Sequence, residues 1–328
     1  MLNLFRSNTL FSILGLLIFT LLLRIAPLFV PIYEQPNINT PLAQLLFHWL
    51  NNNPVYVGNQ FLLSSFLVFF QALLLNYIST DNSILYKDSL LPGLFFVIIN
   101  SIYPQQLILS PQMIANSFLL LMLFRICYLY DSESPILLVF DIGVLLGIGL
   151  QFNYDMLVYL PFILVSIITM TSFNFRYLLV AIIGIIVPAY FLGVIFYLTD
   201  QFGPFIQSFE YSIQKSYFNT PNLPIQKLTT WISLMPPFVF SIFQLQGNYF
   251  RNRVKTRRLQ LTMGILLLFG IFSLYAENQS FIYAIPFLSS SLALAIANYF
   301  ISHKRFWLKE LLLFSTLTTI VLNHYFNN

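Results

Sequence analysis

Charged residues are scarce in this sequence. Of its 328 residues, 15 are basic and 11 acidic, so charged residues make up 8% of the chain, against about 25% in an average soluble domain. Hydrophobic residues make up 58%, and the mean hydropathy is +0.79. So few charges exclude a water-soluble enzyme of this length, and so much hydrophobic content excludes a disordered chain. The class that remains is a polytopic membrane protein.

Cysteine, glycine and histidine are also few. The single cysteine, Cys127, cannot form an internal disulfide, and 12 glycines exclude a collagen-like chain. The three histidines, His48, His303 and His324, are far apart and belong to no metal-binding pattern. The sequence contains neither a Walker loop nor a GxSxG motif, so no metal, nucleotide or hydrolase site is predicted from motifs.

Long apolar runs fill most of the chain. The first, Leu10 to Leu23, lacks the alternation of a barrel strand and no small-x-small cleavage site follows it, so it is predicted to be a retained transmembrane helix. The runs together predict an all-α, polytopic transmembrane helix bundle with about eleven spans, forming a single integral membrane domain over residues 1–328. The predicted spans are 9–30, 57–78, 89–103, 113–130, 136–152, 156–172, 177–198, 229–246, 260–275, 281–301 and 310–325.

The distribution of basic residues predicts the orientation, because cytoplasmic loops retain Lys and Arg. With the N-terminus inside, twelve of the 15 basic residues fall on the cytoplasmic side, and only Arg24, Lys215 and Lys227 fall outside. The densest cluster, residues 251–258, belongs to a predicted inward loop at 247–259. We interpret it as a topology signal with a secondary role in anionic-lipid contact, so no nucleic-acid partner is expected.

The longer segments predicted on the outer face are 31–56, 104–112 and 199–228. The last two are rich in proline, which favours irregular or re-entrant backbone. We therefore expect the specific work of the protein at this face. The prolines concerned are Pro104, Pro111, Pro204, Pro221 and Pro224.

The first outer segment combines an acid with an amphipathic helix. Residues 41–50 place five apolar side chains on one helical face, which suits a helix lying in the membrane interface. Glu34, the sole acid of this segment, could act as a general base toward an acceptor hydroxyl or hold a divalent metal beside a phosphate leaving group. The alternative is a simple ion pair with Arg24. The five apolar residues are Leu42, Leu45, Leu46, Trp49 and Leu50.

The predicted fifth span carries an acid and a glycine motif. Asp141 would either belong to a transport pathway or pair with a base such as Arg125. No further acids are found at similar depth in other spans, which disfavours a proton-coupled transporter. Gly143 and Gly147, with Gly149 beside them, predict close helix packing.

The order of these pieces resembles the GT-C superfamily, membrane glycosyltransferases that use polyprenyl-phosphate sugars. The resemblance rests on an Arg-x-x-Pro stretch ending the first span, an acid in the next loop, an interfacial helix and a late Tyr/Pro stretch after a basic inward loop. It implies a GT-C-like fold, with Glu34 as base or metal ligand, Arg24 orienting it, Lys215 or Lys227 at the donor phosphate and Tyr283 in substrate binding. The residues concerned are Arg24-Ile25-Ala26-Pro27, Glu34, 41–50, 251–258 and Tyr283-Ala284-Ile285-Pro286-Phe287-Leu288.

Two departures separate the sequence from active GT-C members. Glu34 stands alone where paired acids are common, and Gln279, Ser280 and Phe281 occupy positions where an Arg or His often precedes the late stretch. Both departures favour a second hypothesis, a non-catalytic subunit.

The middle of the chain resembles a family of multipass inner-membrane proteins of Gram-negative bacteria that has no assigned activity. The matching stretches are 71–76, 109–116 and 140–143. This resemblance implies a location in the bacterial inner membrane, and helix-packing roles for Asn116 and Asp141.

Three functions are therefore carried forward. The leading hypothesis is sugar transfer from a polyprenyl-phosphate donor at the outer face, with membrane lipids as partners and a divalent metal as a possible cofactor. The second is a non-catalytic subunit that scaffolds an envelope complex for secretion or motility and has protein partners. The third is a transporter.

Overall fold

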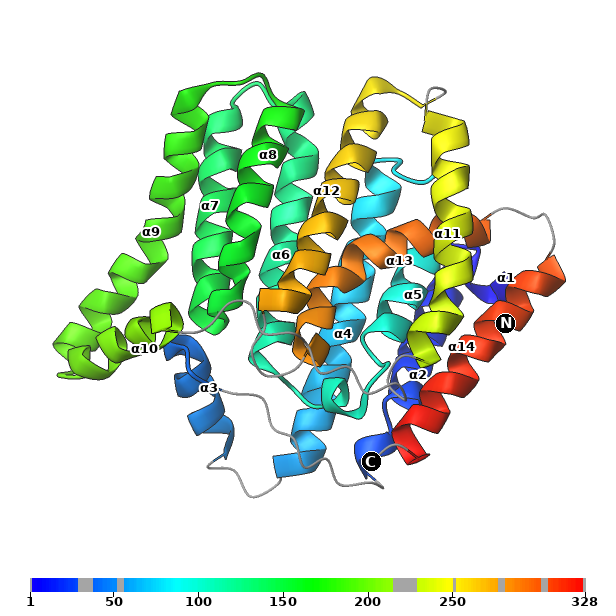
Figure 1. Ribbon diagram of the computed structural model, residues 1–328, viewed down its shortest axis with the longest axis horizontal. Coiled ribbons are helices and arrows are strands. Elements are labelled where there is room, and N and C mark those ends of the chain that lie inside the picture. Colours follow the sequence, from blue (N-terminus) through cyan, green and yellow to red (C-terminus); the bar gives the residue numbers. More distant parts are fainter. Residues whose placement is uncertain are drawn as a thin grey trace.

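The computed structural model describes residues 2–28, 38–51, 56–214, 229–249, 252–276, 281–301 and 306–326. Within these ranges the regular structure is helical throughout and contains no strand, which confirms the predicted all-α class. Figure 1 shows the helices packed side by side as one bundle, with two short helices, α3 and α10, at its lower edge.

Each predicted span contains one helix of the described chain. Three further helices are present: a short N-terminal turn, the predicted interfacial helix and one in the segment at 199–228. In chain order the helices are α1 (Leu2–Phe5), α2 (Leu10–Leu23), α3 (Pro41–Asn51), α4 (Tyr56–Asp81), α5 (Leu91–Ile99), α6 (Pro111–Tyr128), α7 (Pro135–Phe152), α8 (Leu160–Met170), α9 (Phe175–Leu198), α10 (Phe202–Gln214), α11 (Thr229–Tyr249), α12 (Val254–Ala276), α13 (Ile285–Ile301) and α14 (Phe306–Phe326). The 3₁₀ turns are η1 (Ala26–Leu28), η2 (Pro104–Leu107), η3 (Leu129–Asp131), η4 (Tyr154–Tyr159) and η6 (Phe281–Ala284).

Six helices of the described chain are long and apolar enough to cross a membrane, namely α4, α6, α7, α9, α12 and α13 with its preceding turn. Shorter apolar stretches lie in α2, α8 and α11. By contrast α5 has nine residues and is about 14 Å long, less than half of a hydrocarbon core of about 30 Å. The chain is thus a membrane protein by helix length and composition, and the number of eleven spans stays a prediction.

Helix α13 forms the centre of the bundle. In its membrane-length window 94% of the residues are buried, whereas the corresponding share in α9 is 11%. The small residues of α13, among them the run Ser289 to Ser291, let α5, α11 and α12 approach it closely. Helix α9 instead turns large apolar side chains outward, for example Ile183 and Phe191, as expected of a helix whose solvent is lipid.

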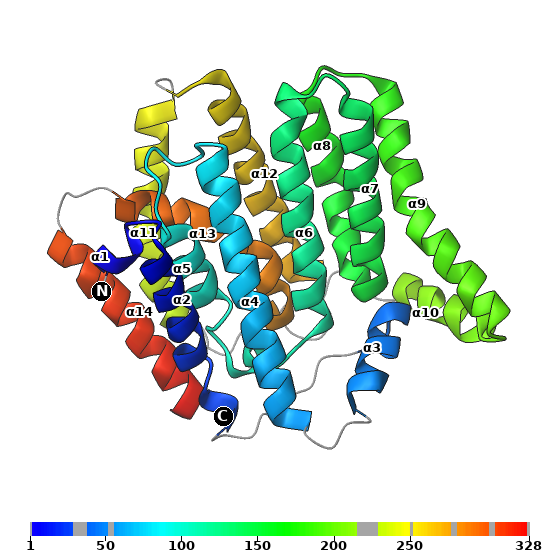
Figure 2. The same ribbon diagram turned by 180° about the vertical axis from the view of Figure 1, so that it is seen from behind.

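The two ends of the bundle differ in charge. One end, which we name the basic end, is formed by the connections after α4, α6, α8 and α11 and by the first turns of α12, and it lies uppermost in Figures 1 and 2. Its described basic residues are Lys87, Arg125, Arg176, Arg253, Lys255, Arg257 and Arg258. The opposite end includes the end of α2, the connection between α5 and α6, α3 and α10 (Figure 1).

Two predicted loops are shorter than expected. The inward loop at 247–259 was predicted from its charges, but α11 reaches Tyr249 and α12 begins at Val254. Basic side chains can occupy the exposed first turns of a helix, so charge alone does not mark a loop. The segment at 199–228 likewise contains α10, because Pro204 lies in the first turn, where proline is tolerated.

Helices α3 and α10 both lie at the opposite end of the bundle, and specific contacts fix α3 there. The hydroxyl of Thr40, just before α3, donates to the carbonyl of Phe152 over 2.8 Å. The face of α3 that packs on the bundle carries Ala43 and Phe47, which the predicted apolar face did not include, while Trp49 is 69% exposed. A helix placed between a bundle and lipid needs apolar residues on both sides, so α3 has the composition of an interfacial helix.

The predicted close packing in the fifth span is confirmed between α7 and α9. A Cβ at Gly143 would collide with the carbonyl oxygen of Ala181, and one at Gly147 would lie 2.5 Å from that of Ile185. Gly184 of α9 makes the reciprocal approach, 2.7 Å from the carbonyl oxygen of Phe140. Small residues therefore let the two backbones touch.

We expect Gly143→Ala to destabilise the protein, because the added methyl group forces α7 and α9 apart. The expected loss is about 1–3 kcal/mol of unfolding free energy, measured by denaturation in detergent micelles. Gly264→Ala in α12 is the matched control, since nothing lies within 4 Å of its Cβ position, and it should be neutral or stabilising by about 1 kcal/mol. Equal stability of the two variants would contradict the packing argument.

Candidate functional site

The connection between α5 and α6, residues 100–110, is non-helical for most of its length and almost wholly buried. Non-helical backbone inside a membrane protein needs donors from the protein itself, because lipid offers none. The turn η2 satisfies part of this need, since the backbone N–H of Gln106 donates to the carbonyl of Tyr103 at 3.0 Å. Five further carbonyl groups of the connection accept from side chains of distant helices.

Arg24 is the principal donor to this connection. It follows the last residue of α2 and is 0% exposed. Its Nη1 donates to the carbonyl of Asn100 at 2.8 Å and its Nη2 to that of Gln106 at 2.7 Å. Nη2 also lies 3.2 Å from the hydroxyl of Ser64, which donates to the carbonyl of Leu107. Among the described residues Arg24 has no carboxylate partner. Its hydrogen bonds hold the backbone of the connection in place.

The last turns of α14 supply the other donors. Asn323 Nδ2 donates to the carbonyl of Ile102 at 3.1 Å, and His324 Nε2 donates to that of Ser101 at 2.8 Å. Both side chains are 2% exposed. The connection is therefore bound from the first long helix, from α4 and from the last helix of the chain.

Gln106 joins this cluster to the start of α13. Its Nε2 donates to the carbonyl of Ile282 at 3.2 Å, one residue before Tyr283. Tyr103 accepts a hydrogen bond from Trp231 Nε1 of α11 at 3.0 Å and packs edge-on against the ring of Phe281. We name the whole set the connection cluster; its side chains are Arg24, Ser64, Tyr103, Gln106, Trp231, Asn323 and His324.

The structure describes two of the five predicted site residues, Arg24 and Tyr283, and both lie beside the turn η2. The carbonyl of Gln106 accepts from Arg24, and its Nε2 donates to the carbonyl of Ile282, the residue before the 3%-exposed Tyr283. Glu34, Lys215 and Lys227 lie outside the described residues, so the structure does not describe contacts between them and Arg24. The catalytic and phosphate-binding roles of these residues thus stay predictions, and the role the described contacts give to Arg24 is structural.

Sequence reasoning did not single out Gln106, Asn323 or His324 as members of the connection cluster. A signal was available in the polar run Asn100-Ser101 and Gln105-Gln106, which interrupts apolar sequence, and in a polar pair at the end of an apolar span. Among the described residues, no three His, Cys, Asp or Glu side chains gather where they would hold a metal ion.

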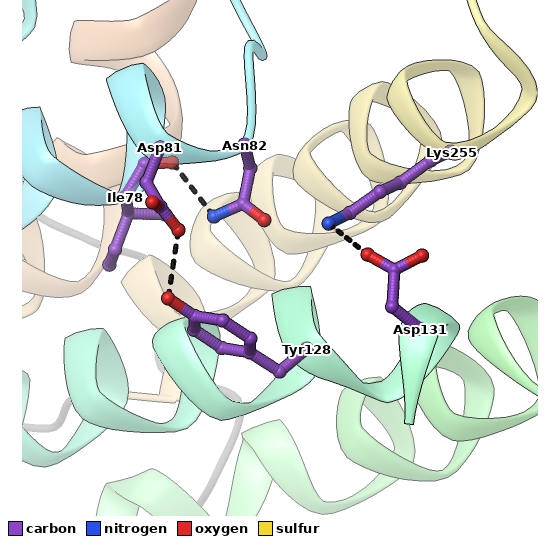
Figure 3. Close-up of polar contacts among 6 residues, drawn as sticks. All are labelled: Ile78, Asp81, Asn82, Tyr128, Asp131 and Lys255. Atoms are coloured by element: carbon purple, nitrogen blue, oxygen red, sulfur yellow. Dashed lines mark hydrogen bonds and ion pairs between the residues drawn. The ribbon is translucent and has the colours of Figure 1, made fainter. Parts of the chain in front are cut away.

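The basic end is held by a different chemistry, in which charged side chains join the helix ends (Figure 3). Tyr128 at the end of α6 donates to Asp81 at the end of α4 over 2.8 Å, and Lys255 of α12 pairs with Asp131 at 2.6 Å. Arg258 donates to the carbonyl of Met170 at the end of α8. These contacts close the ends of four helices, so we assign them to stability.

The predicted pairing of Asp141 with Arg125 is confirmed, with 3.4 Å between Oδ2 and Nη2. The pair joins α7 to α6. Among the described residues no further acid joins it, so its geometry is that of a contact between two helices.

Comparison with known proteins gives one match. A model described as "Family of unknown function (DUF6427)" matches residues 40–328. That range includes Lys215, Lys227 and Tyr283 and begins after Arg24 and Glu34. No curated protein matches the chain.

We expect Arg24→Gln to destabilise the protein strongly, because it removes charged donors from two buried carbonyl groups. The expected loss is about 3 kcal/mol, measured by thermal or denaturant unfolding in detergent. Arg176→Gln is the control, since Arg176 is exposed at the basic end, and its effect should stay within about 0.5 kcal/mol. If both variants lose the same unfolding free energy, Arg24 does not hold the connection in place.

Proposed function

Since the chain belongs to the DUF6427 family of unknown function, we propose its function from its own residues: transfer of a sugar from a polyprenyl-phosphate donor at the outer face of a bacterial inner membrane. In this proposal the N-terminus and the basic end face the cytoplasm. The positive-inside rule supports this orientation, because seven basic residues of the described chain lie at the basic end.

The observation that carries the proposal is the connection cluster at the opposite end of the bundle. It joins residues near 24, 106 and 282 through direct hydrogen bonds. These are the regions in which the GT-C resemblance places its first and late motifs. The amphipathic helices α3 and α10 lie at the same end (Figure 1), where an interfacial site for a lipid-linked substrate needs them.

The proposed reaction assigns one role to each residue. Glu34 takes the proton of the acceptor hydroxyl, whose oxygen bonds to the anomeric carbon of the sugar while the bond from that carbon to the phosphate oxygen breaks. Lys215 or Lys227 binds the phosphate that leaves with the polyprenyl chain. Arg24 positions the connection beneath the site, and Tyr283 contacts the sugar. In the alternative, Glu34 would hold a divalent metal that neutralises the leaving phosphate instead of acting as the base.

We expect Glu34→Gln to abolish sugar transfer, since an amide cannot accept the proton, while protein level in the membrane stays normal. The measurement is a comparison of cell-surface glycans in the wild type, a deletion strain and strains carrying each variant. Glu133→Gln is the control, because Glu133 is exposed at the basic end, and it should restore the wild-type pattern. Unchanged glycans in both the deletion strain and the Glu34→Gln strain would refute the proposal.

The second candidate is a non-catalytic subunit of an envelope complex. It is favoured by the contacts of Arg24, whose described partners are carbonyl and hydroxyl groups of the same chain rather than a substrate pocket. In this function the connection cluster serves only to hold the bundle together.

For the subunit we expect protein partners in stoichiometric amount after purification in mild detergent, and a silent Glu34→Gln substitution. Quantitative mass spectrometry of the purified complex measures this. Recovery of the protein alone, together with loss of a glycan on deletion, would exclude the subunit and leave the transferase.

A further inference from the structure

A pocket of about 300 Å³ lies between α6 and α7 near the basic end. Arg125 and Asp141 form its polar part, and four apolar residues form the rest. All six lining residues are partly exposed, so the pocket opens on the outside of the bundle. The apolar residues are Leu121, Phe124, Val144 and Leu145.

The ion pair in this pocket uses only part of the hydrogen-bonding capacity of its two side chains. The Arg125–Asp141 separation is 3.4 Å and each side chain is 43% exposed. Neither makes another hydrogen bond or ion pair with the described residues. The guanidinium carries five N–H donors and the carboxylate two acceptor oxygens, so most of their bonding capacity is unused by the described residues. The Lys255–Asp131 pair at the same end is closer, at 2.6 Å.

The pair lies within the first two turns of α7, close to the basic end of the bundle. Asp141 lies six residues after the start of α7, which is about 9 Å along the helix axis. The aromatic wall of the pocket, Phe124, contacts Tyr77 and Tyr128 at 5.9 and 5.0 Å between ring centroids. Tyrosine is enriched at the interface between membrane and water, where its ring lies in apolar surroundings and its hydroxyl in polar ones.

We propose that this pocket binds one zwitterionic phospholipid with a primary amine, phosphatidylethanolamine. Its phosphate binds Arg125 and its ammonium group donates to Asp141, so each protein charge meets the opposite charge at the same depth. Leu121, Val144 and Leu145 hold the upper part of an acyl chain. The site lies at the other end of the bundle from the connection cluster and does not depend on the proposed sugar transfer.

The headgroup is specified by the charges. An anionic lipid such as phosphatidylglycerol would place its phosphate on Arg125 but has no ammonium group to pair with Asp141. Phosphatidylcholine carries both charges, but its trimethylammonium group cannot donate a hydrogen bond to the carboxylate. Free phosphoethanolamine lacks the chain that fills the apolar part of the pocket.

The test is native mass spectrometry of the full-length, delipidated protein titrated with these three phospholipids of identical acyl chains. The wild type should bind phosphatidylethanolamine about tenfold more tightly than either other lipid, the value of one charge-assisted hydrogen bond. Asp141→Asn should remove the preference over phosphatidylcholine and phosphatidylglycerol. Arg125→Gln should weaken the binding of all three lipids, and free phosphoethanolamine should not bind.

Lys255→Gln is the matched control, because it breaks an ion pair at the same end without changing the pocket. Its lipid preference should equal that of the wild type, and unfolding temperatures of all variants verify that each is folded. A wild type without preference, or a preference that survives both Asp141→Asn and Arg125→Gln, would overturn the proposal. So would an equal loss in Lys255→Gln.

Discussion

The fold depends on donors for the non-helical backbone between α5 and α6. The connection is buried, so water does not reach its carbonyl groups and the protein itself must supply their hydrogen-bond donors. Arg24 supplies two of the donors, at 2.8 and 2.7 Å, and α14 supplies two more. One buried connection thereby fixes the position of the first long helix relative to the last, although more than 280 residues separate them in sequence.

The packing of the other helices is that expected of a protein surrounded by lipid rather than water. Large apolar side chains face outward on α9, while serines and small residues fill the contacts of α13. Helices in such a medium associate through close van der Waals contact rather than through expulsion of water. The backbone contact at Gly143 and Gly184 is an example, because any larger residue at either position would meet a carbonyl group or a backbone atom.

The helices are joined by different kinds of contact at the two ends of the molecule. At the basic end, an ion pair, an arginine–carbonyl bond and a tyrosine–carboxylate bond connect α4, α6, α8 and α12, and Figure 3 shows the ion pair and the tyrosine bond. At the other end, the described contacts surround the buried Arg24 with neutral acceptors, and the amphipathic helices α3 and α10 lie at the same end. The two ends therefore differ in chemistry: charged side chains lie at one, and irregular backbone held by a buried arginine lies at the other.

Composition and periodicity were sufficient for the membrane class, for a helix in each apolar run, for the glycine contact and for the Arg125–Asp141 pair. The membrane class and the helices depend on composition and on the medium. For the glycines the sequence predicts close packing, and only the structure identifies α9 as the partner helix. The partners of Arg24 lie 76 and 82 residues away, and α10 formed where prolines had predicted a loop. Such features required the tertiary structure, because the polar residues are visible in the sequence but the carbonyl group that each one binds is not.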